Sequence, residues 1–287
     1  MSTKNAAIRK RKPGTNPVAT AAAYVFLTFL LLVEAVPILQ VYINAFRTDS
    51  DVKTRPFGLP TKWVFNNWVE TWKVGGYTRS FLNSLIIAAV VIVVVLLIVG
   101  LGAYALSKME FVGKEFFIGY FFVAISLPGF LYIVPDYFVF NKIGLVNTRV
   151  GLMLLYIAMQ IPFNMLLLRT FLSDIPRDIE EAAKIDGCNE LQVFFKVTMP
   201  IAKTIFLTIA ILVFVNVWNE YLWANTFIAT DALKPLSTSF VKFVGQYSSN
   251  MARIYTASAI TITPIIVIYL IFSQRFIEGM TSGSVKG

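Results

Sequence analysis

LIIAAVVIVVVLLIVGLGAYAL, residues 85–106, is a run of 22 residues without a charged side chain. The hydrocarbon core of a bilayer is about 30 Å thick, and roughly 20 apolar residues in a helix cross it. The run is too long for a barrel strand of about 10 residues, and a helix satisfies its backbone hydrogen bonds internally. This stretch therefore predicts a transmembrane helix and sets the class of the whole chain.

The composition agrees with a membrane protein. Of the 287 residues, 57% are hydrophobic and only 14% are charged, and the mean hydropathy is +0.69. Soluble globular domains rarely reach such values. Histidine is absent and Cys188 is the only cysteine, which disfavours imidazole catalysis, zinc sites and disulfides. We expect Cys188 to serve as a small side chain.

Apolar windows between charged residues predict the number of spans. They lie at about 18–46, between 79 and 108, between 115 and 136, between 149 and 169, after 203, and between 253 and 275. We therefore predict an all-α, polytopic protein with six transmembrane helices. Pro128, Pro162 and Pro264 are expected inside three of them, where neighbouring helices can satisfy the freed carbonyls.

Charge placement predicts the orientation. Five basic residues precede the first span: Lys4, Arg9, Lys10, Arg11 and Lys12. Basic residues next to a span favour the cytoplasmic side, so the net charge of +9 indicates topology rather than nucleic-acid binding. We expect a retained N-terminus, because residues 24–42 are mostly large and apolar. Both termini are predicted to be cytoplasmic.

These signals divide the chain into three parts. They are a basic tail at 1–17, one transmembrane domain at 18–276 and a C-terminal tail at 277–287. The domain includes an external loop at 47–79 and a cytoplasmic module at 173–203. The external loop carries Trp63, Trp68 and Trp72, so it is expected to be ordered at the membrane interface. Two interpretations remain open: an aromatic belt, or a docking surface for an outer partner.

The module at 173–203 contains signals for a short helix. Ser173 and Asp174 are cap candidates, Pro176 suits a first turn, and Gly187 suits the end. The acidic residues Asp178, Glu180 and Glu181 complement the positive end of the helix dipole. We predict about eleven residues, roughly 16 Å long. Such a helix is too short and too charged to cross a membrane.

One face of this helix is nearly smooth. Ile179, Ala182 and Ala183 share it, so another protein could approach closely. A second helix is predicted from Asn189, with Gln192 completing a capping box, and Pro200 is expected to end it. The alternative is an amphipathic hairpin that packs only against its own bundle.

The spacing across this module resembles a family signature. Glu181, Ala182, Ala183, three residues, Gly187, nine residues and then Val197, Thr198, Met199, Pro200 resemble E-A-A-x3-G-x9-I-x-L-P. That signature occurs in the permease subunits of bacterial ABC importers; valine replaces isoleucine here and methionine replaces leucine. Residues 144–156, 175–187, 218–224 and 274–287 are also similar to the shorter, six-helix permease of maltose-type carbohydrate importers. The resemblance covers nearly the whole chain.

The resemblance implies a type I importer permease (MetI-like) fold in a bacterial inner or plasma membrane. The implied partners are a second permease, two cytoplasmic ATPase subunits, an extracytoplasmic solute-binding protein and a sugar or oligosaccharide substrate. A non-sugar such as glycerol phosphate is the alternative. The short helix would be the coupling helix that docks on the ATPase. The residues implied in coupling are Glu181, Ala182, Ala183, Asp186, Gly187 and Pro200.

The chain itself is expected to be non-catalytic. It has no G-x4-G-K-[ST] loop, so ATP and magnesium would be bound by the partner ATPase and this chain would hold no cofactor. The absence of histidine and of a cysteine pair also disfavours a membrane-embedded enzyme. Membrane lipid is an expected neighbour, and nucleic acid is not.

Four polar residues at membrane depth are candidates for the substrate pathway: Asn164, Asn216, Asn219 and Glu220. Amides and carboxylates bind sugar hydroxyls, and the last three are predicted to share one face of the fifth span. The alternative is interhelical hydrogen bonding. Glu34 and Glu220 together define a rival function, an ion-coupled secondary transporter that needs no ATPase.

Overall fold

The computed structural model describes residues 17–245 and 250–281, and within these residues all regular structure is helical. The predicted all-α class is confirmed. The basic cluster at 4–12 and residues 282–287 lie outside the described residues. The helices in chain order are α1 (Pro17–Ala45), α2 (Asp49–Thr54), α3 (Asn66–Gly75), α4 (Tyr77–Lys108), α5 (Lys114–Ser126), η1 (Gly129–Tyr132), α6 (Ile133–Lys142), α7 (Arg149–Ser173), α8 (Arg177–Ile185), α9 (Glu190–Val193), η2 (Phe194–Thr198), α10 (Met199–Ile201), α11 (Lys203–Asn219), α12 (Leu222–Phe227), η3 (Asp231–Leu233), α13 (Leu236–Ser239), α14 (Val241–Gly245) and α15 (Met251–Thr281).

Four helices in the described part of the chain are long and apolar enough to cross a membrane: α1, α4, α7 and α15. Two further apolar stretches are bent pairs. The α5 to α6 pair bends by 93°, and the pair formed by 190–201 and α11 bends by 81°. If each bent pair is one crossing, the described residues contain six spans, which agrees with the prediction.

The third span differs from the continuous helix that was predicted. Helix α5 ends at Ser126, and Leu127 is extended, with φ −92° and ψ 127°. Pro128 follows, and a residue before proline is sterically disfavoured from helical geometry. Pro128 therefore stands at a break instead of inside a helix, whereas Pro162 and Pro264 lie inside α7 and α15 as predicted.

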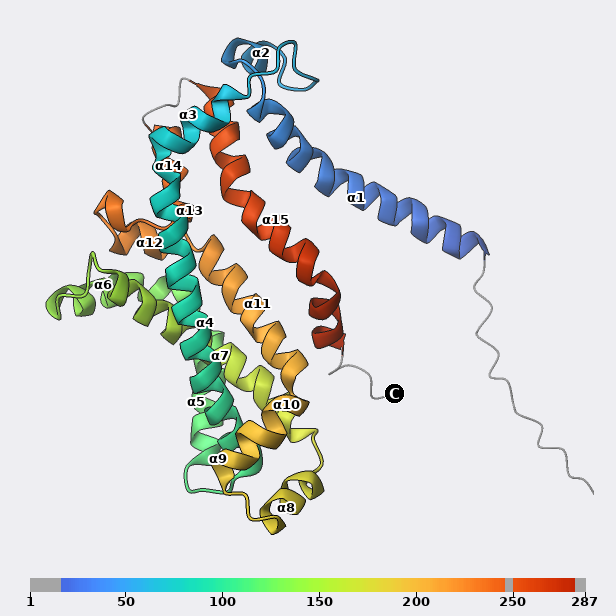
Figure 1. Cartoon of the computed structure of the whole chain (residues 1–287), viewed down its shortest axis with the longest axis vertical. Helices are drawn as coiled ribbons and strands as arrows, with labels where there is room; N and C mark the ends of the chain where they lie inside the picture. Colours follow the sequence, from blue (N-terminus) through green and yellow to red (C-terminus); the bar gives the residue numbers. More distant parts are fainter. Residues whose placement is uncertain (1–16, 246–249, 282–287) are drawn as a thin grey trace, which may run out of the picture.

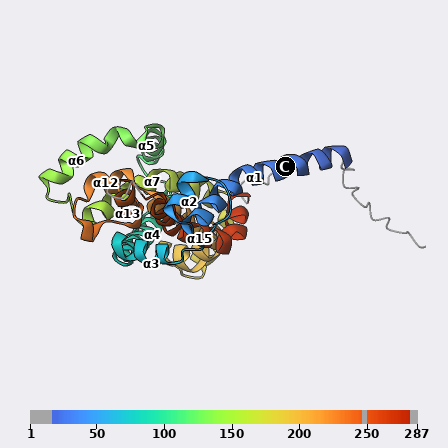
Figure 2. The same cartoon turned by 90° about the horizontal axis from the view of Figure 1, so that it is seen from above.

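The core forms where α4 packs along α7, with α11 against α4 and α15 (Figure 1). Val91, Val95, Val99 and Ala103 recur every four residues on α4 and are fully buried. Small side chains on one helical stripe let neighbouring helices approach closely. Helix α1 leaves this core at an angle (Figures 1 and 2), and none of its most apolar window is buried.

Polar contacts hold the α3 end of α4, at the top of Figure 1. Ser80 and Ser239 are joined hydroxyl to hydroxyl at 2.7 Å, and Ser84 accepts a 2.8 Å hydrogen bond from the Leu236 amide. Asn83 donates to the carbonyl groups of Ala232 and Lys234, both at 3.0 Å. This end of α4 is therefore bound to the segment that joins α12 to α14.

The loop between α1 and α4 is ordered, as predicted. Arg47 is fully buried, and its guanidinium donates to Asp51 Oδ2 at 2.9 Å and to Asn44 Oδ1 at 2.8 Å. Asp51 also pairs with Arg55 and accepts from the Thr61 amide at 3.2 Å. The guanidinium groups of Arg47 and Arg55 hold the pKa of Asp51 well below its usual range. One buried ion cluster therefore organises this loop.

Candidate coupling site

Helix α8 lies at the end of the molecule opposite α3 (Figure 1). It has nine residues, so it is about 13 Å long, slightly shorter than predicted. The predicted caps were wrong: α7 runs through Ser173, Asp174 is the C-cap of α7, and Pro176 with ψ 135° stands at the α8 N-cap without a side-chain cap. The proline disfavours a helical conformation for Ile175, and the chain bends there between the two helices.

The predicted stop at Gly187 is confirmed. Gly187 adopts φ +86°, a left-handed conformation that glycine adopts without strain. The Cys188 amide donates to the Ala183 carbonyl and the Gly187 amide to the Lys184 carbonyl, both at 3.0 Å. This pattern is the Schellman motif, which satisfies the last carbonyls of a helix.

Most of the predicted coupling residues share the open side of α8. Glu181, Ala182, Asp186 and Gly187 are exposed, whereas Ala183 is half-buried and packs against the core. Ile185, at the end of the helix, keeps 86% of its surface exposed. Ile179 is also exposed, at 41%, so the open side combines acidic and small side chains with two large apolar residues.

The second short helix begins as predicted, with a capping box. The Gln192 amide donates to Asn189 Oδ1 at 2.9 Å, and Gln192 Oε1 accepts from the Asn189 amide at 3.0 Å. The helix continues through a π-helical segment at Phe194–Thr198 and ends at Ile201, one residue beyond the predicted end at Pro200. The chain then turns at Ala202 into α11.

A buried ion pair anchors α8 to α4. Lys108 Nζ, on the last residue of α4, lies 3.2 Å from Glu180 Oε1 and donates to the Ile175 carbonyl at 2.6 Å. The Thr198 hydroxyl lies 3.5 Å from the same Glu180 oxygen. Glu180 was not among the predicted site residues. No sequence signal separated Glu180 from its acidic neighbours Asp178 and Glu181, because its burial depends on how α4 packs beside α8.

A second contact reaches α4 through α9. Tyr104 donates to Glu190 Oε2 at 2.9 Å, and Lys184 Nζ lies 2.6 Å from Glu190 Oε1. The Lys184 ammonium is the main cause that lowers the pKa of Glu190. At the start of α8, Arg177 lies 3.6 Å from Glu110, whose pKa is lowered mainly by Lys114. These outer pairs are largely exposed to solvent.

Two of the candidate pathway residues meet at Gln160. Asn216, exposed on α11, donates to Gln160 Oε1 at 3.1 Å, and Asn164, buried on α7, donates to the Gln160 carbonyl at 2.7 Å. Asn164 Oδ1 is buried and accepts no hydrogen bond from the described residues. The Asn216 contact joins α7 to α11, which is the interhelical bonding that the sequence left as an alternative.

Glu220 does not share a helical face with Asn216 and Asn219, so this prediction was wrong. Helix α11 ends at Asn219, and Glu220 is extended, with ψ 119°. Its carboxylate instead accepts from the amides of Trp223 at 2.8 Å and Ala224 at 2.9 Å, at the start of α12. Carboxylates satisfy the free amides of a helix N-terminus well, which explains the departure from helical geometry.

The other two polar candidates remain accessible. Asn219 is exposed and lines a cavity of about 480 Å³ with Tyr221, Ser237, Ser258 and Thr261 among its walls. Glu34 is exposed on α1. Asn219 therefore stays compatible with a pathway wall, and Glu34 lies on the helix that leaves the core.

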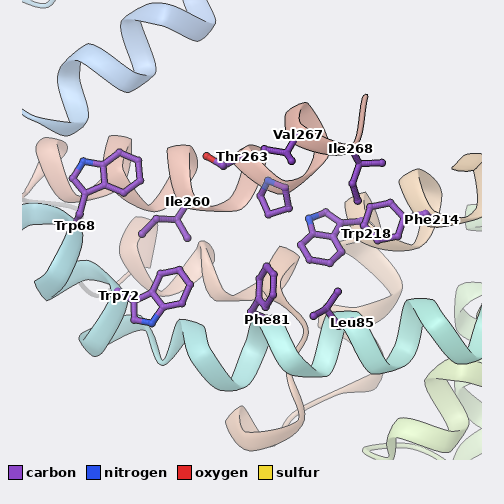
Figure 3. A pocket seen from close by; sticks show the side chains of 11 residues that line it. Trp68, Trp72, Phe81, Leu85, Phe214, Trp218, Ile260, Thr263, Val267 and Ile268 are labelled. Atoms are coloured by element: carbon purple, nitrogen blue, oxygen red, sulfur yellow. The ribbon is translucent and has the colours of Figure 1, made fainter. Parts of the chain in front are cut away.

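Figure 3 shows another cavity, of about 440 Å³, near the α3 end. Aromatic rings from α3, α4 and α11 surround it, including Trp68, Trp72, Phe81 and Trp218. Thr263 contributes a hydroxyl, and that hydroxyl contacts Tyr42 at 2.7 Å. Such a lining suits hydrocarbon better than a polyol, because sugar hydroxyls need several hydrogen-bond partners. We assign no substrate role to this cavity.

Within the described ranges, no group of three or more Asp, Glu or Cys side chains is placed to hold a metal ion. The structure around α8 is a short helix with a Schellman motif at its C-terminus, an exposed and mostly acidic side, and a buried ion pair to α4.

Comparison with known families decides the assignment. The sequence model of the family described as "Binding-protein-dependent transport system inner membrane component" matches residues 17–281. The chain belongs to this family. It is a membrane component of a transport system of this class, in agreement with the resemblance found in the sequence.

Individual members of the family are similar over almost the whole chain. The probable ABC transporter permease protein YurM of Bacillus subtilis is 33% identical, covering 94% of this chain and 90% of YurM. The diacetylchitobiose uptake system permease protein NgcG of Streptomyces coelicolor is 30% identical (93% and 89%), and the trehalose transport system permease protein SugB of Mycobacterium tuberculosis is 32% identical (88% and 92%).

A solved structure shares the fold. A chain of a bacterial ABC transporter involved in the import of the acidic polysaccharide alginate superposes with a TM-score of 0.78. The match covers 92% of this chain and 99% of that chain, at 23% sequence identity. The family's permease fold is therefore present here.

Proposed function

We propose that this chain is one of the two permease subunits of an ATP-driven, binding-protein-dependent importer for a sugar or oligosaccharide. It would form half of an alternating-access pathway and hold no cofactor itself. ATP and magnesium would be bound and used by two cytoplasmic ATPase subunits, and a solute-binding protein would deliver the substrate.

The observation that carries this proposal is the exposed side of α8. Glu181, Ala182 and Asp186 project from a capped helix at one end of the molecule, and Gly187 ends it. A rigid helix with small and acidic side chains suits a cleft with basic rims in another protein. We assign coupling to these residues, with Ala183 and Pro200 supporting them from the half-buried side and from the adjacent helix.

The substrate class is supported by the relatives. Their names give diacetylchitobiose, trehalose, arabinooligosaccharides, and melibiose, raffinose and stachyose as the molecules they carry. Asn219, exposed in a cavity wall, and Asn216, exposed on α11, are our candidates for the polar wall of the pathway in this chain. Of the other two predicted residues, Asn164 is buried and the carboxylate of Glu220 is taken up by structural hydrogen bonds. The substrate is tested by purifying the solute-binding protein that supports transport through this chain and identifying the ligand that it retains. A phosphorylated polyol in that protein would replace the sugar assignment.

We propose that α8 and both termini face the cytoplasm and that the α2 to α3 region faces outward. This orientation is tested with single cysteines in a Cys188→Ser background. Lys196→Cys should react with a membrane-impermeant maleimide only in inverted vesicles, and Lys62→Cys only in right-side-out cells. Both lysines are exposed, so access depends on the side of the membrane. The reverse pattern would overturn the proposed topology.

The coupling assignment is tested in the assembled transporter. Glu181→Lys reverses a charge on the open side of α8, whereas Glu115→Lys reverses an exposed charge on α5 and serves as the control. We expect Glu181→Lys to lose both the co-purifying ATPase and substrate-stimulated ATP hydrolysis, and Glu115→Lys to keep both. Retention of both by Glu181→Lys would refute the proposal.

A further inference from the structure

We propose that the buried Lys108–Glu180 pair is the positioning element that passes movement of α8 to α4. This inference rests on the proposed function, in which α8 receives the ATPase movement. Lys108 and Glu180 would act through α8 and not by touching substrate or nucleotide.

The first argument is the convergence of contacts on one ammonium group. Lys108 Nζ contacts the Glu180 carboxylate at 3.2 Å and the Ile175 carbonyl at 2.6 Å. The Thr198 hydroxyl lies 3.5 Å from the same carboxylate. The last residue of α4 is thus joined directly to α8 and to Ile175 in the turn before it, and Glu180 links this pair to the π-helical segment. Movement of α8 or of that turn relative to α4 would break a contact.

The second argument is burial. The side chains of Lys108 and Glu180 are only 3% and 6% exposed. Water cannot readily replace either partner, so separating them would leave two unpaired charges in a site of low polarity. A buried ion pair is poor evidence for stability, but a pair that cannot exchange with water can fix a relative orientation.

The third argument is the contrast with the other ion pairs of α8. Lys184 and Glu190 are each 45% exposed, and Arg177 and Glu110 are 59% and 73% exposed. Exposed pairs are screened and exchange readily with water. Among the ion pairs that α8 makes within the described residues, Lys108–Glu180 is the one shielded from solvent.

The fourth argument is the position of α4. This helix makes the most extensive helix contact in the structure, with α7, and its far end is bound to 231–239. A displacement of Lys108 would therefore move α4, the helix at the centre of the bundle. Neighbouring packing supports the same route, since the Phe194 ring lies 5.5 Å from the Tyr104 ring on α4.

The test uses the complete transporter, with its ATPase subunits and binding protein, in proteoliposomes. Lys108→Met removes the charge, and Lys108→Arg keeps it. Glu110→Gln, on an exposed pair at the same end, is the control. The readouts are co-purification of the ATPase and the number of ATP molecules hydrolysed per substrate transported. A merely structural role would change assembly but not this ratio.

We expect Lys108→Met to retain the ATPase but to transport about tenfold less substrate per ATP, a typical size for coupling between sites. Lys108→Arg and Glu110→Gln should stay close to the unmodified transporter. The double variant Lys108→Glu with Glu180→Lys should recover part of the loss. Should Lys108→Met fail to assemble, Glu180→Gln, which keeps the shape of the side chain, replaces it under the same criteria.

An unchanged ATP-to-substrate ratio in the assembled Lys108→Met or Glu180→Gln transporter would overturn the inference. That failure is distinguishable from failure of the proposed function. If Glu181→Lys abolishes ATPase binding while the ratio stays normal in Lys108→Met, α8 still couples but this pair does not transmit. If Glu181→Lys leaves binding and transport intact, the coupling role of α8 is itself wrong.

Discussion

The phenol of Tyr156 donates a 2.6 Å hydrogen bond to Oε2 of Glu220, which links α7 to the turn between α11 and α12. The same carboxylate accepts from the amides of Trp223 and Ala224, and the Glu220 carbonyl accepts from Ser237 at 2.6 Å. Glu220 therefore connects three separate segments. A membrane carboxylate with this set of donors has a clear structural role.

Tyr156→Phe is expected to destabilise the fold. The substitution keeps the buried ring and removes one hydrogen bond to a carboxylate, a contact worth about 1.5–3 kcal/mol. Thermal unfolding in detergent would measure the loss. Tyr120→Phe removes an exposed hydroxyl and should change the free energy of unfolding by less than about 0.5 kcal/mol. Equal effects of the two substitutions would show that the Tyr156 contact contributes nothing.

Gly187→Ala is expected to loosen the last turn of α8. Space for a methyl group is open, so the cost comes from the left-handed conformation, about 1–2 kcal/mol for a residue with a Cβ. Gly119, inside α5, also has open space but helical geometry, and Gly119→Ala should gain about 0.5–1 kcal/mol. Hydrogen exchange of the α8 amides should rise in the first variant only. Protection equal to that of the unmodified protein would contradict the strain argument.

Gly100→Ala and Gly102→Ala are expected to differ although the two glycines are near neighbours on α4. A Cβ at Gly100 would lie 3.1 Å from the rings of Phe194 and Phe206, which are buried and packed. A Cβ at Gly102 would meet the terminal methyl of Met165 at 2.6 Å, and a flexible side chain can move away. Gly100→Ala should cost about 1–3 kcal/mol and Gly102→Ala much less. Denaturation of the two purified variants would measure both losses in the free energy of unfolding. A larger loss in Gly102→Ala would mean that the rings of Phe194 and Phe206 can move aside.

The ion cluster around Asp51 predicts a pH limit for the loop between α1 and α3. The ordinary pKa of this carboxyl is 3.8, and the two arginines lower it in the folded state. A lowered pKa stabilises the fold above the ordinary value, and the contribution is lost as the pH falls through the folded pKa. The protection factors of residues 52–61, which correct for the intrinsic pH dependence of amide exchange, should therefore stay constant down to about pH 4 and fall below it.

Asp51→Asn is the control for that measurement. It removes the titrating group and leaves the buried Arg47 without its carboxylate, so exchange in the same residues should be fast at neutral pH as well. If this variant and the unmodified chain exchanged alike at pH 7, the cluster would not be what holds the loop.

Much of the fold could be predicted because membrane spans are local features. Helices α4, α7 and α15 follow from charge-free windows, and their limits agree with the flanking basic residues. The bend at Pro128 could not be predicted in this way, because this residue was equally consistent with a proline tolerated inside a span. The bend at Ala202 lies two residues beyond the end that was predicted at Pro200.

In the candidate site, too, contacts between residues close in sequence could be predicted and contacts that depend on tertiary packing could not. The end of α8 at Gly187 and the capping box of Asn189 and Gln192 are contacts between residues a few positions apart, so sequence spacing was sufficient. The Lys108–Glu180 pair joins residues far apart in the chain and depends on how α4 packs beside α8. Glu220 was misplaced for a related reason, because its contact with Tyr156 depends on tertiary packing.

Helix α4 has 32 residues and is about 48 Å long. Directional hydrogen bonds hold its two ends, at Ser80 to Ser84 and at Tyr104 to Lys108. Between them its buried stripe is Val91, Val95 and Val99, whose dispersion contacts have little directional preference. The close-packed middle of the helix transmits strain instead of absorbing it. In mechanical terms α4 is a connecting rod, and under the proposed coupling role a displacement at Lys108 is passed to the segment 231–239.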